Sequence, residues 1–212
     1  MNAKQYVEDL RAESFAQVFN PYADRCAVHD ARRAEATRAR TLARLLVVAS
    51  AREIDALWLG RDLGWRGGRR TGLALTDDAH REAHLARFGL AAPRPTRGPL
   101  MAERTAEVVW SSLARADGSF FLWNVFPLHP HLPGAPFSNR PHGARERDAG
   151  EAYLNELIFL LRPRRVVALG AEAAHSAARV APRLPVVQIR HPSYGGQRLF
   201  LAQVAALARD AP

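Results

Sequence analysis

Short apolar runs alternate along this chain with longer segments in which apolar residues recur every three or four positions. Short runs of apolar, β-branched and aromatic residues are typical of buried β-strands. They occur at residues 55–59, 120–125, 165–169 and 186–189. The pattern therefore predicts four strands, all in the last three quarters of the chain.

The longer segments are amphipathic and predict helices. In residues 102–115, for example, Ala106, Val109, Trp110 and Leu113 fall on one face, as expected for a helix that packs on a core. The predicted helices span residues 3–18, 34–52, 77–88, 102–115, 145–161, 171–180 and 196–209. Glycine- and proline-rich stretches predict loops at 61–76, at 93–99 and from 126 to 142.

Strands and helices alternate from residue 55 onward. Such alternation predicts an α/β fold with a mainly parallel four-stranded central sheet and helices on both faces, a three-layer αβα arrangement. We expect one domain over residues 1–212, in which the helices of residues 1–54 pack on a core formed by residues 55–209.

Composition agrees with a globular α/β domain. Of 212 residues, 48% are hydrophobic and 24% are charged. The sequence has no apolar run long enough to cross a membrane, and its first residues lack the apolar segment of a signal peptide. Cys26 is the single cysteine, which excludes an intrachain disulfide and a multi-cysteine metal cluster. We expect a cytoplasmic protein.

The chain carries a formal net charge of +9. A strongly basic protein favours polyanionic partners, and nucleic acid is the first candidate. All basic residues except Lys4 are arginine. Arginine binds phosphate in a bidentate manner, but an excess of arginine over lysine also arises from a GC-rich genome, so charge alone leaves both explanations open.

Polar residues follow three of the predicted strands. They are the segment 60–64 (GRDLG), Asn124 and the segment 191–193 (HPS). Because ligands of open parallel sheets bind at the carboxyl ends of the strands, these distant segments are expected to meet in one pocket.

Taken singly, each polar segment has an ordinary structural alternative. Asp62 is also suited to a turn or a helix cap, and its neighbouring arginines to a solvated surface. The stretch 60–71 lacks the spacing of a phosphate-binding P-loop and of a dinucleotide fingerprint. Asn124 can satisfy backbone groups at a strand end, or its amide can read a pyrimidine edge. His191 can mark a turn, or its imidazole can stabilise a leaving group.

Other histidines give weaker signals. His80 and His84 are four residues apart, but the glutamate that directly follows the first histidine of a zinc-protease helix is missing, and we expect no metal. Cys26 and His29 are interpreted most simply as a small buried thiol and a surface imidazole.

Together, the three segments resemble those of the uracil-DNA glycosylase superfamily. Residues 60–64 match its first motif, residues 123–127 (WNVFP) match the strand that ends in its base-reading asparagine, and residues 191–193 match its His-Pro-Ser motif. The three motifs occur in the superfamily's order, and the resemblance covers residues 55–209. Residues 60–77 also resemble a bacterial branch without cluster-binding cysteines.

The resemblance implies a role for each matching residue. Asp62 and His191 would be catalytic: the aspartate would orient water and the histidine would donate to pyrimidine O2. The base would be held by Gly60, Gly64, Trp65, Leu75 and Asn124. Phosphates would be contacted by Arg66, Arg69, Arg70, Ser193 and Arg198, and Tyr194 or Arg198 would fill the gap left in the duplex. No cofactor is implied.

The chain departs from the superfamily pattern at several positions. Leu63 replaces the usual proline of the first motif, and Leu75 stands where members commonly stack a phenylalanine on the base. Gly64 stands where the uracil-strict enzymes place a tyrosine that excludes a methyl group at pyrimidine C5, so more space is expected there.

We therefore expect a monofunctional DNA glycosylase for uracil or a related damaged pyrimidine, acting on single- or double-stranded DNA as a monomer, without a membrane. One alternative is a glycosylase for C5-modified pyrimidines, for example in phage DNA; Gly64 and Leu75 favour it. A second is a DNA-binding protein with a degenerate active site, which Leu63 favours. A third is a nucleotide or phosphate-ligand enzyme that uses the arginine-rich loop.

Overall fold

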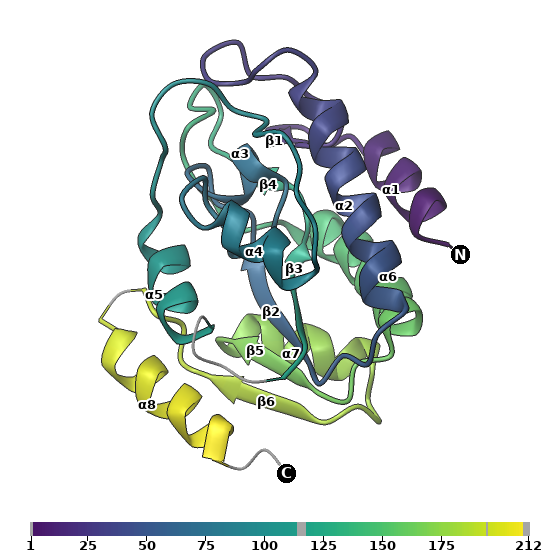
Figure 1. Cartoon of the computed structure of the whole chain (residues 1–212), viewed down its shortest axis with the longest axis vertical. Coiled ribbons are helices and arrows are strands. Elements are labelled where there is room, and N and C mark those ends of the chain that lie inside the picture. Colours follow the sequence, from purple (N-terminus) through teal and green to yellow (C-terminus); the bar gives the residue numbers. More distant parts are fainter. Residues whose placement is uncertain (1, 114–117, 194, 210–212) are drawn as a thin grey trace.

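The structure, a computed structural model, describes residues 2–113, 118–193 and 195–209 (Figure 1). Its helices are α1 Ala3–Ala12, α2 Ala34–Ser50, α3 Gly68–Thr71, α4 Arg81–Arg87, α5 Arg104–Leu113, α6 Ala144–Leu161, α7 Ala171–Val180 and α8 Gln197–Arg209. Its strands are β1 Val18–Phe19, β2 Ala56–Asp62, β3 Phe120–Phe126, β4 His129–Pro130, β5 Val166–Leu169 and β6 Val186–Ile189.

Four parallel strands form the central sheet in the order β3-β2-β5-β6. This confirms the predicted α/β class and the four-stranded parallel sheet. The strand β2 continues three residues beyond the predicted end at residue 59, so Gly60, Arg61 and Asp62 lie on the strand itself. In the register of the sheet, Gly60 is paired with Asn124 of β3.

Two predicted helices are markedly shorter in the structure. The predicted helix 3–18 ends at Ala12, where the Asn20 amide donates to the carbonyl oxygens of Leu10 and Glu13. The chain then forms β1, which pairs with β4 in a small antiparallel ribbon that the sequence pattern did not predict. The predicted helix 77–88 begins only at Arg81.

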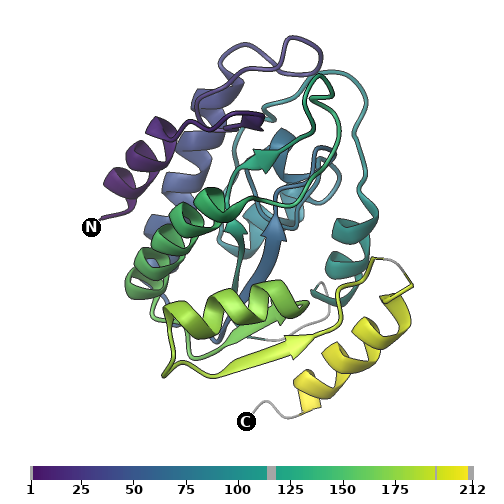
Figure 2. The same cartoon turned by 180° about the vertical axis from the view of Figure 1, so that it is seen from behind.

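Helices cover both faces of the sheet in three layers. Alternate residues of each strand point to opposite faces, and the two sides belong to two separate apolar clusters. On one face, Leu57 and Leu59 pack with residues of α1, α2, α6 and α7. Seen from behind, α6 and α7 lie in front of the sheet (Figure 2). Gly150 of α6 allows close packing on β3, because a Cβ there would lie 2.3 Å from the Val125 carbonyl oxygen.

The opposite face is covered by α5 and α8, which lie side by side (Figure 1). Ala56 and Trp58 of β2 pack there with Trp110 of α5 and Phe200 of α8. The face of α5 predicted from the sequence, Ala106, Val109, Trp110 and Leu113, is fully buried.

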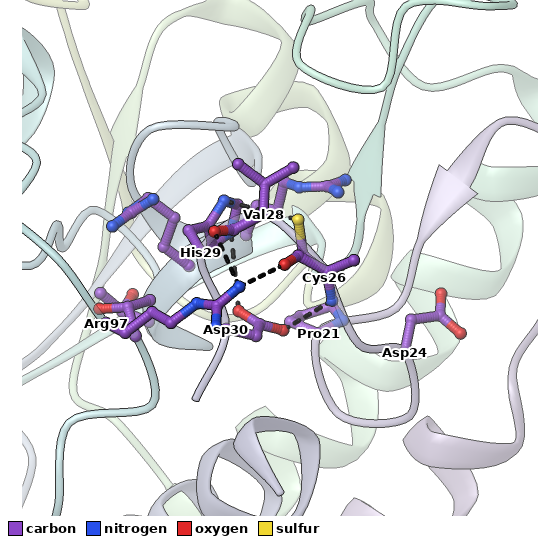
Figure 3. A network of polar contacts seen from close by, with 12 residues as sticks. Pro21, Asp24, Cys26, Val28, His29, Asp30 and Arg97 are labelled. Atoms are coloured by element: carbon purple, nitrogen blue, oxygen red, sulfur yellow. Dashed lines mark hydrogen bonds and ion pairs between the residues drawn. The ribbon is translucent and has the colours of Figure 1, made fainter. Parts of the chain in front are cut away.

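A buried polar network attaches the segment between β1 and α2 to the rest of the molecule (Figure 3). The Arg38 guanidinium forms two hydrogen bonds of 2.9 Å with the Asp30 carboxylate, and both side chains are inaccessible to solvent. The Oδ2 atom of the Asp30 carboxylate also accepts a hydrogen bond of 2.8 Å from the Cys26 backbone nitrogen.

His29 belongs to this network and is buried, so the expectation of a surface imidazole was wrong. Its Nδ1 lies 3.5 Å from the Cys26 sulfur, and its ring stacks obliquely against Phe137. Burial, followed by the nearby Arg70 charge, lowers the pKa of His29 to about 4. The thiol of Cys26 is buried as expected.

Within the described residues, no helix combines the length and the apolar character that a membrane span requires. The same residues contain no group of three or more histidine, cysteine, aspartate or glutamate side chains arranged to hold a metal ion.

We expect the free energy of unfolding to fall as the pH is lowered from about 6.5 to about 4. Burial lowers the pKa of His29 to about 4 and the pKa values of His84 and His129 to about 3. In this pH window the unfolded chain binds protons that the folded chain excludes, so acid favours unfolding by up to about 1.4 kcal/mol per pH unit for each histidine.

Chemical denaturation between pH 7.5 and 4.5 measures this slope. His191 contributes in the same way, because its pKa is lowered to about 4. His84→Gln removes one of these four histidines and should lower the slope by about one proton. His175→Gln, on the exposed face of α7, should leave it unchanged. Equal slopes in the wild type and His84→Gln would contradict the assignment.

Candidate active site

A cavity of about 340 Å³ opens at the carboxyl edge of the parallel sheet. All four strands contribute to it through their last residues or the loops that follow. The polar segments singled out in the sequence meet here, because Asp62, Asn124 and His191 all line this one cavity. Gly64, Leu75 and Ser193 line it as well.

Asp62 is held from two sides at the end of β2. His142 Nδ1 lies 2.5 Å from its Oδ1, and Arg61 Nε donates to its Oδ2 at 2.7 Å. The Asp62 and His142 side chains are only 9% and 5% exposed, whereas Arg61 extends toward solvent. The two contacts fix the carboxylate in one orientation and leave further lone pairs on each oxygen.

Asn124 reaches across the neighbouring strand. Its Nδ2 donates to the Asp62 carbonyl oxygen at 2.9 Å. A Cβ at Gly60 would lie 2.7 Å from the same nitrogen, so this crossing requires glycine. Gly60 is therefore a support beneath Asn124 rather than a lining residue of the cavity, which corrects its expected direct contact with the base.

The bond to Asp62 determines how the Asn124 amide is presented. With Nδ2 engaged, Oδ1 is the free end; it is buried and has no hydrogen-bond partner among the described residues. A buried acceptor without a donor costs about 1–3 kcal/mol. The cavity therefore contains an acceptor suited to an N–H group of a ligand.

His191 is a neutral imidazole near pH 7. Burial, followed by the charges of Arg61 and Arg190, lowers its pKa to about 4. Its Nδ1 accepts a hydrogen bond of 3.2 Å from the Ser193 backbone. In a neutral ring this leaves Nε2 as the protonated nitrogen, so His191 is a hydrogen-bond donor surrounded by positive charge.

Leu75 forms an apolar part of the wall. Its backbone adopts the left-handed conformation, with φ of 52°, which is costly for a residue other than glycine. The Trp110 indole nitrogen donates to the Leu75 carbonyl oxygen and holds the turn in place. The side chain lies beside Gly60, where a Cβ would be 3.0 Å from its Cδ2.

Glu103 also lines the cavity, just before α5, and the sequence did not single it out. Burial, followed by the charge of Asp77, raises its pKa to about 7. Its backbone nitrogen donates to the Asp77 carboxylate at 2.6 Å. Its carboxyl group lies against Gly64, where a Cβ would be 2.6 Å from Oε1. The space expected at Gly64 is therefore occupied.

Two of the arginines predicted to contact phosphate are buried instead. Arg70 is paired with Asp78 through hydrogen bonds of 2.8 and 2.6 Å. The Arg69 guanidinium lies over the Phe19 ring at 3.8 Å and contacts His129 Nδ1 at 3.2 Å. Their exposed fractions are only 4% and 3%. Both arginines stabilise the glycine-rich loop from within, which corrects the expected phosphate contacts.

The remaining predicted contacts lie around the cavity. Trp65 is not among the lining residues; its ring lies 5.9 Å from that of Phe137, and Arg66 is stacked on it at 4.9 Å. Arg66 and Arg198 are exposed. Tyr194 lies outside the described residues.

His142 was the other contributor that sequence reasoning missed. It follows Asn139, Arg140 and Pro141 in the long loop after β3, which the sequence marked only as proline-rich. Arg140 fixes that loop through a two-pronged ion pair with Glu146 of α6. The position of this histidine in the loop that follows Asn124 and β3 was the one available signal.

The chain is similar both to a protein family and to solved structures. A profile of the uracil DNA glycosylase superfamily matches residues 51–208. The crystal structure of wild-type SMUG2 from Pedobacter heparinus superposes with a TM-score of 0.57 at 15% sequence identity, over 98% of this chain and 97% of that one. At this identity the likeness concerns the fold. No curated protein matches the chain.

We expect NMR titration to find the pKa of His191 near 4 and to find it higher in Arg61→Gln and in Arg190→Gln. Each substitution removes a positive charge that disfavours the imidazolium. Arg183→Gln, in the exposed connection between α7 and β6 at the opposite edge of the sheet, is the control. A wild-type value near 6.5 would refute this description of the site.

Proposed function

The chain belongs to the uracil DNA glycosylase superfamily, and on this basis we propose that it hydrolyses the N-glycosidic bond of uracil or a related modified pyrimidine in DNA. The target nucleotide leaves the base stack and enters the cavity at the sheet edge. The base departs and an abasic site remains. Side chains of the protein and one water molecule carry out the reaction.

The observation that carries the proposal is the unpaired Oδ1 of Asn124, a residue that lines the cavity. The N3–H of a uracil-type ring supplies the donor that this oxygen lacks. The Nδ2 group keeps a second hydrogen, which is available to the neighbouring O4. Asn124 thus matches the N3/O4 edge of uracil, and the hydrogen bond to Asp62 prevents the amide from turning to present the opposite pattern.

His191 is suited to the departing base. As the glycosidic bond breaks, negative charge develops on the pyrimidine, much of it on O2. A preorganised neutral donor stabilises such a charge without transferring a proton. The Nε2–H of His191 provides that donor, and the positive charges of Arg61 and Arg190 that lower its pKa also favour an anion beside it.

Asp62 is suited to the sugar side of the reaction. Its carboxylate accepts a proton from the attacking water as the bond forms and stabilises positive charge on the sugar. His142 and Arg61 hold the carboxylate in position. His142 is therefore a positioning residue for Asp62.

The basic surface supports DNA as the partner. The net charge is +9, and Arg66, Arg190 and Arg198 are exposed on segments at the cavity. Arg190 lines the cavity, and Arg66 and Arg198 lie close in sequence to the lining residues Gly64 and Ser193; exposed positive charges of this kind favour a phosphate backbone.

We expect Asp62→Asn and His191→Ala each to lower the single-turnover rate of uracil excision by about tenfold to a hundredfold or more. Each substitution removes a preorganised group that acts on charge in the transition state. The measurement uses an oligonucleotide with one uracil, with alkaline cleavage of the abasic product.

Asp148→Asn, an exposed carboxylate on α6, serves as the matched control and should excise at the wild-type rate. Binding of both site variants to an abasic oligonucleotide should persist, which shows that the fold is intact. Wild-type rates in both variants would disprove the assigned roles.

We also expect Arg66→Ala and Arg198→Ala to weaken DNA binding to a similar degree for every sequence. Each loss of one phosphate contact should shallow the dependence of log K on log salt concentration by about 0.9. Arg183→Ala is the control, because Arg183 is exposed at the opposite edge of the sheet. Replacing the buried Arg70 with alanine should instead lower the melting temperature of the protein, because the buried Asp78 then loses its ion-pair partner. An unchanged slope for Arg66→Ala and Arg198→Ala would show that neither contacts phosphate.

A further inference from the structure

We propose that Glu103 determines specificity in the cavity by favouring pyrimidines whose C5 substituent ends in a hydrogen-bond donor or a positive charge. This inference rests on the proposed glycosylase function and narrows its substrate class. Hydroxymethyl and aminomethyl groups are the simplest substituents of this kind, and a methyl group is the matched substituent without a donor.

Two glycines admit the Glu103 carboxyl group into the wall. A Cβ at Gly67 would lie 2.0 Å from Oε2, and a Cβ at Gly64 would lie 2.6 Å from Oε1. Any larger residue at either position displaces the carboxyl group. The glycine-rich loop after β2 therefore provides room for a specific acidic side chain, and it does not leave an empty space beside the base.

The Glu103 carboxyl group has no hydrogen-bond or ion-pair partner within the part of the chain that the structure describes. Two other carboxylates at the cavity are paired: Asp62 with His142 and Arg61, and Asp77 with His80. Glu172 also lines the cavity but is exposed to solvent, whereas Glu103 lies in the wall. A carboxyl group that lines a cavity without a partner is available to a ligand. Its pKa is raised to about 7, so the group is about half ionised at neutral pH, and its ionised form can accept from an O–H or an N–H donor.

The position of the base assigns the contact to the C5 side of the ring. His191 faces O2 and Asn124 faces N3 and O4 in the proposed complex. The C5–C6 edge is the part of the ring that these residues leave uncovered. Glu103 and Gly64 form a part of the wall that neither His191 nor Asn124 provides, so a C5 substituent is directed to the carboxyl group.

A carboxylate in this position favours C5 substituents that carry a donor and disfavours those that lack one. It forms a charge-assisted hydrogen bond with a hydroxymethyl group and an ion pair with an aminomethyl group. A methyl group forms neither and removes water from the carboxylate, which is unfavourable. A site that hydrogen-bonds a polar substituent strongly rejects the analogue without that substituent. This discrimination is far larger than the one an apolar pocket achieves between ligands of different size.

Single-turnover excision tests the inference on four oligonucleotides that differ at one base: uracil, thymine, 5-hydroxymethyluracil and 5-aminomethyluracil. The wild type should excise both donor-bearing bases at least about tenfold faster than thymine. Glu103→Ala should reduce both ratios to near one. Glu103→Gln keeps a neutral acceptor, so it should retain the hydroxymethyl preference and lose most of the aminomethyl preference.

Glu107→Gln provides the matched control, because Glu107 is an exposed carboxylate on α5 that does not line this cavity; its ratios should equal those of the wild type. Uracil excision by each Glu103 variant serves as the measure of an intact site, since uracil has no C5 substituent. If Glu103→Ala does not fold, Glu103→Gln tests the inference on its own. This variant replaces one oxygen of the carboxyl group, and the result is the ratio of the excision rates of 5-aminomethyluracil and thymine.

The outcomes separate the inference from the function on which it rests. Excision with the same ratios in the wild type and both Glu103 variants overturns the role of Glu103 and leaves the glycosylase intact. Equal rates of excision of thymine and of the two donor-bearing bases by the wild type also overturn the role of Glu103 and leave the glycosylase intact. Excision of none of the four bases by the wild type overturns the proposed function and the substrate preference together.

Discussion

The hydrogen bond from the Asn124 amide to the Asp62 carbonyl oxygen is the contact on which the candidate site depends. It joins β3 to β2 at the edge where both strands end, and it is possible only because Gly60 has no side chain at the point of crossing. The same bond orients the asparagine and fixes the backbone that carries the Asp62 carboxylate. The proposed base-reading group and the proposed catalytic group thus depend on one hydrogen bond. Their relative position follows from the register of two parallel strands, which is a rigid part of the fold.

The charged and buried groups around this hydrogen bond set the protonation states of His191 and Glu103 at neutral pH. His191 is neutral because it is partly buried between arginines, and those arginines also produce the positive field that an anionic leaving group requires. Asp62 is held in one orientation by its contacts with Arg61 and His142. Glu103 lies between the two cases, because burial and Asp77 oppose its ionisation while Arg66 favours it. The cavity therefore combines a fixed donor, a fixed anion and one carboxyl group whose charge depends on what lies beside it.

The strands, their parallel arrangement and the meeting of Asp62, Asn124 and His191 were predictable from the sequence. Local periodicity identifies a strand, and parallel strands place their carboxyl ends at one edge, so the convergence followed from chain order alone. The burial of Arg69 and Arg70 was not predictable, because a run of arginines has the same local pattern whether its partners are phosphates or a distant Asp78 and Phe19. Glu103 and His142 were missed for a related reason. Each comes from a segment without a motif and reaches the site through long-range packing, about which local spacing carries no information.

Leu75, which lines the cavity, adopts an unfavourable backbone conformation. A leucine in the left-handed region costs on the order of 1–3 kcal/mol relative to a comfortable backbone, a cost that glycine would largely avoid. Glycine at this position would also remove the apolar side chain that lies beside Asn124 and closes the wall. Laboratory evolution that selects only for thermal resistance would therefore tend to replace this leucine and open the pocket. A selection that retains catalysis would have to find its stabilising changes elsewhere in the chain.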